Sequence, residues 1–360
     1  MGIKHQSAGG SHKIKLTINT AQTTCAVFYY EDLTLHPIIL TVLQRLFLGV
    51  VTLIVVSVII FAAIEMLPGD FGEAVLGQAA TTETVAAFRR ELGLDQPAHV
   101  RYFEWIVGVF QGDLGTSFSG RAASGVDRSR EVAELIAPRL WNTLFLAGMT
   151  AIIAVPLALF LGITAALYRN TYYDKIVSAS TLTTISFPEF FVAYILILLL
   201  TALWPVFPSL ANIDAATPLG ERVYRSALPA LTLTLVIVAH MMRMTRAAII
   251  NLLANPYIQM ARLSGATQRE VILKHALPNA WAPIATVIAF NLAYLVVGVV
   301  VVEVVFVYPG VGQLMVDAVT SRDIPVVQGC ALIFAITYIF LNLLADIIGI
   351  ITNPRLLHPK

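Results

Sequence analysis

Long runs of apolar residues without a charged side chain are the feature of this sequence that most limits its fold. A helix needs about 20 mostly apolar residues to cross the hydrocarbon core of a membrane, and runs of that length recur along the chain. Only 12% of the residues are charged, whereas a soluble domain carries about 25%. The runs therefore exclude a soluble globular protein. They are continuous rather than alternating, so they also exclude a barrel of membrane strands.

These runs predict an all-α membrane protein with six transmembrane helices. Pro156 lies inside the second run, and the pair Pro188-Glu189 interrupts the third. Residues 1–40 are polar and mixed, which favours a disordered cytoplasmic leader over a cleavable signal peptide, with an artefact of the assigned start site left open. The predicted helices cover about residues 41–66, 140–167, 176–204, 226–248, 279–303 and 326–350.

The positions of Lys and Arg in the short loops predict the orientation. Basic residues collect in cytoplasmic loops, and six spans place both termini on the same side of the membrane. The opposite short loops hold only Arg222, Arg225 and Arg322. We therefore expect both termini in the cytoplasm. The basic residues on the side of the termini are Lys4, Lys13, Lys15, Arg45, Arg169, Lys175, Arg243, Arg246, Arg262, Arg269, Lys274, Arg355 and Lys360.

The segment 67–139 between the first two spans is too long for a simple loop. Residues 82–92 begin with polar side chains and are followed by Gly93, a typical helix end. Residues 100–110 are amphipathic to apolar, as in helices that lie in a membrane interface. We expect a small helical cap on the external face.

Motifs for catalysis or nucleotide binding are absent from the sequence. It contains no GxxxxGK[ST], HExxH or GxSxG, and its seven histidines are not spaced for a metal. We therefore expect no catalytic residue, no metal and no cofactor on this chain. The net charge of +1 argues against nucleic acid as a partner. Cys25 and Cys330 form no recognisable pair, and we interpret them as incidental.

The loop 249–278, between the fourth and fifth spans, is long, basic and helical in its spacing. It follows the spacing of the EAA motif of ABC importer permeases, which is E-A-A, three residues, Gly, nine residues, Ile, any residue, Leu-Pro. An ordinary loop helix ended by a proline is the alternative on these residues alone. The motif positions are matched by Ala261, Gly265, Leu277 and Pro278 and replaced by Gln259, Met260 and His275.

Further motifs extend this similarity over about residues 38–356. They are LPGD (67–70), RELGLDQP (90–97), GDLGTS (112–117), YPGVGQL (308–314), RDIPVVQG (322–329) and NPR (353–355). In this order and spacing, the chain resembles the inner-membrane permease subunit of dipeptide/oligopeptide (peptide/nickel) ABC importers. Among those subunits it resembles the one with the large external segment after helix 1.

The resemblance implies a transmembrane permease domain over 41–356, with an external cap at 67–139 and a cytoplasmic coupling helix in the loop 249–278. It implies that ATP and Mg bind to partner ATPases, so this chain is not an enzyme. The implied location is the bacterial inner membrane. The implied partners are a second homologous permease subunit, two ABC ATPase subunits, an extracytoplasmic substrate-binding protein and the lipid bilayer.

The implied coupling residues are Gln259, Met260, Ala261, Arg262, Gly265, His275, Leu277 and Pro278. Gly265 permits a sharp turn, and Pro278 is expected to end one helix and to fit the first turn of the next. The basic side chains Arg262, Arg269 and Lys274 either pair with acidic groups on the ATPase or face lipid headgroups.

Ionisable residues within the spans are candidates for the translocation pathway, because a charge in the membrane is costly. Glu189 follows Pro188 at a break in the third span, where it either meets the amino group of a passing peptide or forms a buried structural pair. Asn291 and Glu303 are the other pathway candidates, although Glu303 lies near a helix end and Asp346 is expected to pair structurally.

Three classes of function compete. An ABC-importer permease for di- or oligopeptides is the first, with nickel chelates, sugars or opine-like solutes as alternative cargo. A secondary transporter or channel predicts inverted repeats and a charge relay, and we find no convincing repeat. A membrane scaffold would not need the spacing of the coupling loop. The solute itself is usually selected by the binding protein, so the sequence of this chain does not identify it.

Overall fold

The computed structural model describes residues 37–66, 80–91, 93, 95–118, 129–214 and 216–351. Most of the predicted leader, and the parts 67–79 and 119–128 of the external segment, lie outside these ranges. The tail motif at 353–355 lies outside them as well. Within the described ranges the chain forms helices without strands, apart from one isolated antiparallel bridge between Thr116 and Glu131.

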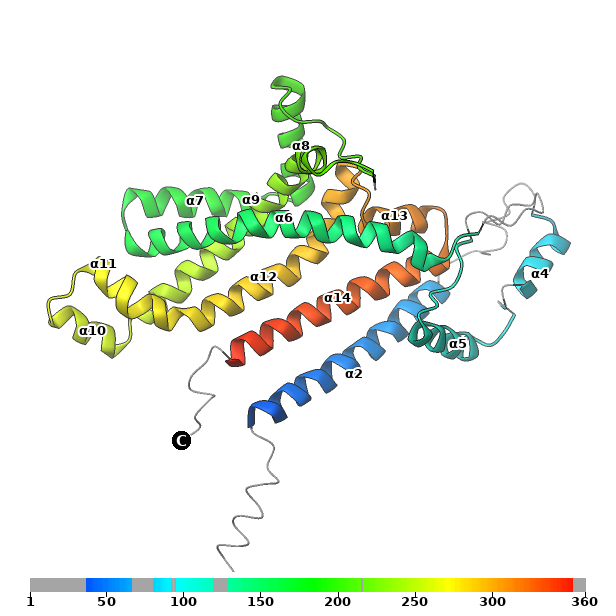
Figure 1. Cartoon of the computed structure of the whole chain (residues 1–360), viewed down its shortest axis with the longest axis horizontal. Coiled ribbons are helices and arrows are strands. Elements are labelled where there is room, and N and C mark those ends of the chain that lie inside the picture. The colour runs from blue at the N-terminus through cyan, green and yellow to red at the C-terminus, as the bar shows by residue number, and fades with distance from the viewer. Residues whose placement is uncertain are drawn as a thin grey trace, which may run out of the picture.

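The helices form an elongated bundle with small helices at each end (Figure 1). Two of the elements, η2 and η3, are π-helical. In chain order, the elements are α2 (Pro37–Glu65), α4 (Thr82–Glu91), α5 (Ala98–Gln111), α6 (Val132–Leu167), α7 (Tyr172–Ser186), α8 (Glu189–Ile197), η2 (Leu198–Leu203), α9 (Leu219–Leu253), α10 (Pro256–Leu263), α11 (Gln268–Glu270), η3 (Val271–Ala276), α12 (Leu277–Val305), α13 (Val311–Thr320) and α14 (Ile324–Ile351).

Five of the described helices, α2, α6, α9, α12 and α14, are long and apolar enough to cross a membrane. The pair α7 and α8–η2 makes a sixth candidate, but the two parts meet at an angle of 102°. The fold class is therefore confirmed, and the chain bends at Pro188-Glu189, the pair that interrupts the third apolar run. Phe187 and Pro188 are extended at the break, because a proline disfavours helical backbone in the residue before it.

Two membrane helices begin earlier in the chain than we predicted. α6 begins at Val132 rather than at 140, and α9 begins at Leu219 rather than at 226. The predicted spans stopped at Arg139 and Arg225, the charged residues that bound the apolar runs. Charged side chains are tolerated near the ends of membrane helices, so the helices continue through them.

The centre of the bundle is the contact between α6 and α9. Small residues of α6, among them Ala154, Ala158 and Ala165, are buried along this contact. At Gly162, an added Cβ atom would lie 2.9 Å from the carbonyl oxygen of Met242. Small residues allow helix backbones to approach closely in membranes, where packing drives helix association. α12 joins this core through buried aliphatic side chains: Leu295, Val299 and Val302.

The outer side of the bundle is built from α14 and α2. α2 packs against α14 and α5, and most of its apolar side chains are exposed. Arg45 of α2 and Asp346 of α14 form an exposed ion pair of 3.1 Å, which confirms the structural pairing expected for Asp346. α2 therefore has a wide apolar face that is not covered by the described part of the chain.

The predicted coupling loop and the predicted cap lie at opposite ends of the bundle. α10 and α11 lie at one end, and α4, α5 and α13 lie at the other (Figure 1). α5 contacts α2, where Ser57 Oγ and Tyr102 Oη are 2.8 Å apart and Arg101 forms an ion pair with Glu65. Phe103, Val107 and Phe110 leave one side of α5 apolar and exposed, so a place in the membrane interface stays a prediction for this helix.

The contact of α6 with α9 generates a prediction. Gly162→Ala should lower the thermal stability of the purified protein, by about 1–3 kcal/mol, because the new methyl group would overpack the contact with Met242 and Thr245. Gly148→Ala is the control in the same helix, since its Cβ atom would meet nothing within 4 Å. That change should be neutral or stabilising, because Ala is the better helix former. Equal stabilities of the two variants would contradict the packing.

Candidate coupling and translocation sites

The α10 helix is amphipathic and lies at the end of α9. Ile258 is its buried residue and packs with Val271 and Ala276 of η3. Tyr257, Met260 and Leu263 are exposed on the helix, the last two with 67% and 83% of their surface accessible. One apolar side chain therefore anchors α10 to the bundle, and three others are exposed on its outer surface.

Gly265 forms the turn that follows α10. Its φ angle is +89°, in the left-handed region that favours glycine, and its N–H donates to the carbonyl of Arg262 at 3.0 Å. A Cβ atom at this position would meet nothing within 4 Å. The need for glycine is therefore conformational rather than steric. This turn was expected, whereas its role in coupling stays a prediction.

The segment after the turn begins with a capping box. The backbone N–H of Thr267 donates to Glu270 Oε2 at 3.1 Å, and the N–H of Glu270 donates to Thr267 Oγ1 at 3.3 Å. Lys274 Nζ donates to Glu270 Oε1 at 3.2 Å. The hydrogen bond from the Thr267 N–H and, as the second cause, the one from Lys274 hold the pKa of Glu270 below its usual value. Lys274 thus has a partner within the chain, whereas Arg262 and Arg269 are exposed.

The other predicted coupling residues lie around this turn and in η3. Gln259 and His275 are exposed, and Ala261 packs against the cluster of Ile258. Leu277 has helical backbone angles, so η3 leads directly into α12. We expected Pro278 to end a helix, but the helix continues through this position, and Pro278 is the second residue of α12.

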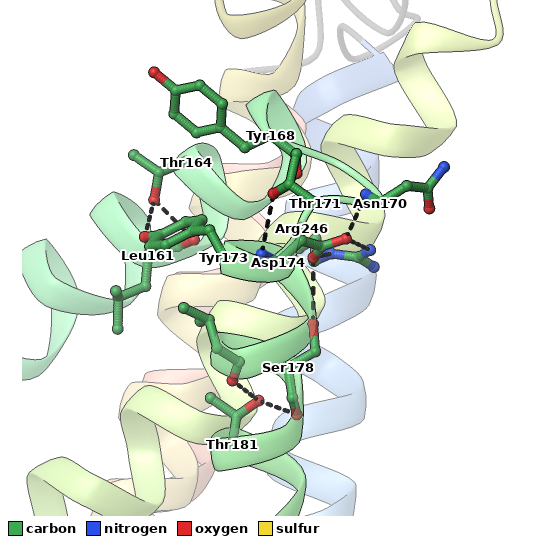
Figure 2. Close-up of polar contacts among 11 residues, drawn as sticks. Leu161, Thr164, Tyr168, Asn170, Thr171, Tyr173, Asp174, Ser178, Thr181 and Arg246 are labelled. Atoms are coloured by element: carbon green, nitrogen blue, oxygen red, sulfur yellow. Dashed lines mark hydrogen bonds and ion pairs between the residues drawn. The ribbon is translucent and has the colours of Figure 1, made fainter.

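A buried ion pair lies toward the C-terminal end of α9, the end that leads into α10. Arg246 of α9 donates twice to the carboxylate of Asp174 in α7, from Nε at 2.7 Å and from Nη2 at 2.8 Å (Figure 2). The N–H of Asn170 and the hydroxyl of Ser178 donate to the same carboxylate. Asp174 is 4% exposed. One carboxylate therefore ties the turn between α6 and α7 to the helix that leads into α10.

Sequence reasoning missed this ion pair. Arg246 entered the analysis only as one of the basic residues of a cytoplasmic loop, and Asp174 was not considered. A local signal was present, because Thr171 caps α7 and accepts a bond from the N–H of Asp174 at 3.4 Å, a spacing typical of helix starts. Nothing in the sequence indicated that Arg246, more than 70 positions later, would be the partner.

Glu303 is enclosed between α6, α12 and α13. Its carboxylate is fully buried, accepts from Thr143 Oγ1 at 2.6 Å, and accepts from the N–H groups of Gly312 and Gln313 at 2.7 and 3.2 Å. A Cβ atom at Gly310 would overlap this carboxylate. Glu303 therefore caps the first turn of α13, and its part in the pathway stays a prediction.

Three further residues, which the sequence analysis did not single out for this role, extend this cap. Asn142 donates to the carbonyl of Pro309 at 2.9 Å, and Tyr308 donates to the carbonyl of Asn142 at 2.8 Å. Arg222 of α9 donates to Asn142 Oδ1 at 3.0 Å. The YPGVGQL motif at 308–314 is thus the turn that packs against Glu303 of α12 and against α6, which explains its glycines.

Two of the sequence motifs at the other end of the bundle also contact each other. The hydroxyl of Ser117 and the N–H of Phe118 both donate to the buried carboxylate of Asp323, the second at 3.0 Å. Asp323 precedes α14, whereas Ser117 belongs to the cap. The GDLGTS and RDIPVVQG motifs are therefore two sides of one contact, which joins the cap to the turn between α13 and α14.

Two of the predicted pathway residues lie together where α8, α9 and α12 meet. Tyr294 Oη donates to Glu189 Oε1 at 3.4 Å, and Asn291 lies one helical turn before Tyr294. Asn291 is buried, and its amide donates to the carbonyl of Val287 at 2.8 Å. The ring of His240 lies 6.1 Å from that of Tyr294. Pro188, the third candidate, is the N-cap of α8 and sets the direction of Glu189.

The residues that the structure describes contain no group of three His, Cys, Asp or Glu side chains that could hold a metal. Cys330 is a free, buried thiol in the contact of α6, α13 and α14. Three polar clusters therefore lie between the described helices, around Asp174, Glu303 and Glu189, and the exposed helix α10 lies at one end of the bundle.

The ion pair between Asp174 and Arg246 generates a prediction. Asp174→Asn should cost about 3 kcal/mol of stability in a thermal unfolding assay, because it leaves the guanidinium group of Arg246 without its counter-charge. Asp346→Asn is the matched control, since its pair with Arg45 is exposed and should contribute less than about 1 kcal/mol. A neutral Asp174→Asn variant would show that the pair does not hold α7 on α9.

Two family models together match almost the whole described chain. The binding-protein-dependent transport system inner membrane component matches residues 158–358. The N-terminal part of the membrane component of binding-protein-dependent transport systems matches residues 38–147.

Relatives of known name also match over most of the chain. The glutathione transport system permease protein GsiC of Salmonella choleraesuis (strain SC-B67) is 35% identical over 315 residues, which is 88% of this chain and 98% of that protein. GsiC of Escherichia coli (strain K12) is 34% identical over the same shares. Among solved structures, the MetNI methionine ABC transporter in an inward-facing conformation matches with a TM-score of 0.48 and 17% identity, covering 61% of this chain and 97% of that chain.

The two models cover the membrane helices and the coupling loop, and the relatives are covered almost end to end. Such a chain is a multi-pass inner-membrane protein that works with ATPase and binding-protein components. This chain therefore belongs to the inner-membrane components of binding-protein-dependent transport systems, the permease subunits of ABC importers.

Proposed function

We propose that this chain forms half of the translocation pathway of an ATP-driven importer for small peptides, which an extracytoplasmic binding protein delivers. The observation that carries the proposal is the identity of 35% with permeases named for glutathione, a tripeptide, over 98% of their length. Nickel chelates, sugars and opine-like conjugates are the alternative solutes for the same transporter class.

The proposed assembly contains one copy of this chain, a second homologous permease, two ATPase subunits that bind ATP and Mg, and one binding protein. The apolar residues that α8 and η2 expose, among them Phe190, Tyr194 and Leu203, fit burial against lipid or the second permease. The exposed face of α10 is proposed to bind in a groove on an ATPase. A short rigid helix suits this role because it transmits the movement of a partner with little loss.

The proposed orientation places both termini and α10 in the cytoplasm and the cap outside. Two observations support it. Basic residues are concentrated in the loops at the end of α10, and α5 and α13 lie at the opposite end of the bundle (Figure 1). The binding protein then docks on the cap and on α13. The contact of Ser117 and Phe118 with Asp323 joins the cap to the turn that follows α13.

The coupling role of α10 is tested by removing its exposed apolar side chains. A double variant, Met260→Ser with Leu263→Ser, should reduce ATPase co-purification and ATP-driven uptake of radiolabelled glutathione at least tenfold. Each buried apolar side chain contributes about 1.5–3 kcal/mol to a contact. Both side chains are exposed in the single chain, so insertion and membrane abundance should be unchanged.

Two controls separate coupling from folding. Val319→Ser removes an exposed apolar side chain at the other end of the bundle and should leave ATPase binding unchanged. Gly265→Ala strains the left-handed turn without adding a side chain that reaches the ATPase. Normal ATPase binding and uptake by the double variant would refute the coupling role. Uptake of a nickel chelate or sugar, but not of peptide, would replace the proposed solute.

The proposed orientation is tested with single cysteines. In a chain carrying Cys25→Ser and Cys330→Ser, a thiol at Ala98 should react with a membrane-impermeant maleimide from outside, and a thiol at Ser264 only from inside. Both positions are exposed, and Ser264 lies beside the turn at Gly265. Labelling of both thiols from one side of sealed vesicles would contradict the orientation.

A further inference from the structure

Glu189 differs from the other carboxylates that are buried in the bundle. Asp174 has a guanidinium partner, and Glu303 accepts three hydrogen bonds from Thr143, Gly312 and Gln313. Glu189 accepts one long bond of 3.4 Å from Tyr294, and no cationic nitrogen of the described residues lies within ion-pair distance of it. A carboxylate can accept about four hydrogen bonds, so most of its capacity is unused.

The backbone holds Glu189 in this position. Pro188 is the N-cap of α8, and the chain turns there by 102° between α7 and α8–η2. Glu189 occupies the first turn of α8, where the helix dipole favours a negative charge without a cationic neighbour. The break therefore places an acceptor with free capacity inside the membrane part of the chain.

The surface in front of the carboxylate belongs to one side of α12. Asn291, Tyr294 and Gly298 follow each other at intervals of three and four residues, so they share a face of the helix. A Cβ atom at Gly298 would lie 3.4 Å from Glu189 Oε2, so the glycine leaves that oxygen uncovered on this side. Tyr294 is 44% exposed and Glu189 is half-buried. A group that approaches along this face reaches both side chains.

We infer that Glu189 and Tyr294 form a contact site for the ammonium group of the transported solute on the wall of the pathway. An ammonium group brings three donors and the opposite charge, and the ring of Tyr294 adds a favourable surface for a cation. One carboxylate and one ring make a weak site, so the solute is released again. The inference rests on the proposed function, since it assigns one chemical group of the solute to one position of the pathway.

The charge and accessibility of the site are tested without any substrate. The complete importer is purified with Gly298→Cys in the permease, in the chain with Cys25→Ser and Cys330→Ser. Its thiol is allowed to react with a cationic trimethylammonium-ethyl methanethiosulfonate and with the anionic sulfonato-ethyl reagent. The ratio of the two rates is then measured again after adding Glu189→Gln. A thiol at Ser264, in the exposed turn after α10, is the control.

We expect the cationic reagent to be favoured at least tenfold more with Glu189 than with Gln at that position, because the carboxylate lies beside the thiol. The ratio at Ser264 should not respond to Glu189→Gln. An equal ratio in both backgrounds overturns the inference. A thiol that reacts with neither charged reagent overturns it as well, because a charged solute group could not reach the carboxylate either.

A second measurement covers the case in which Gly298→Cys does not fold. In vesicles with ATPases and binding protein, Glu189→Gln should reduce uptake of radiolabelled glutathione at least fivefold, while binding-protein-stimulated ATP hydrolysis persists. Glu189→Asp should recover part of the uptake. Full uptake by Glu189→Gln overturns the inference. If the unchanged importer takes up no peptide, the proposed function fails, and the ratio of thiol reaction rates then decides on the cation site alone.

Discussion

The hydrocarbon core of a membrane offers no hydrogen-bonding partner, and this constraint explains how the polar residues of the bundle are arranged. Each polar group that enters the core has to be paired by the chain itself. Arg246 pairs with Asp174, and the turn at 308–313 folds over Glu303 so that backbone N–H groups saturate its carboxylate. These pairings fix how α7 lies on α9 and how α13 lies on α12, and therefore the positions of both ends of the bundle.

One carboxylate is paired only in part by the described residues. Glu189 is left with spare acceptor capacity at a break between two helices, which is where irregular backbone in a membrane protein usually lines a cavity. A continuous series of contacts connects Glu189 to the end of the bundle that holds α10. α10 follows α9, and Arg246 of α9 holds Asp174 of α7 (Figures 1 and 2). α7 ends at Ser186, and Glu189 begins α8 after the break at Phe187 and Pro188. The exposed helix and the polar cluster are thus joined by packed and ion-paired elements.

Much of the fold was predictable because lipid imposes a simple rule on sequence. Apolar runs of sufficient length predict membrane helices, and the five long helices and the bent pair follow those runs. The bend itself was not predicted in size, since Pro188 indicates that a helix stops but not in which direction the chain continues. The helix ends were also misplaced, because Arg139 and Arg225 stop an apolar run without stopping a helix.

The sequence alone determined the class of the protein, the number of its apolar runs, and the glycine and capping residues of the turn at 265–270, because these depend on local chemistry and spacing. The tertiary structure alone decided what the isolated polar residues do. Glu303 and Glu189 look alike in the sequence, yet one is enclosed by Thr143 and α13 and the other faces Tyr294 with most of its acceptors free. Their side-chain partners, Thr143 and Tyr294, are 160 and 105 positions away, and only the packing of α6, α8 and α12 brings such residues together.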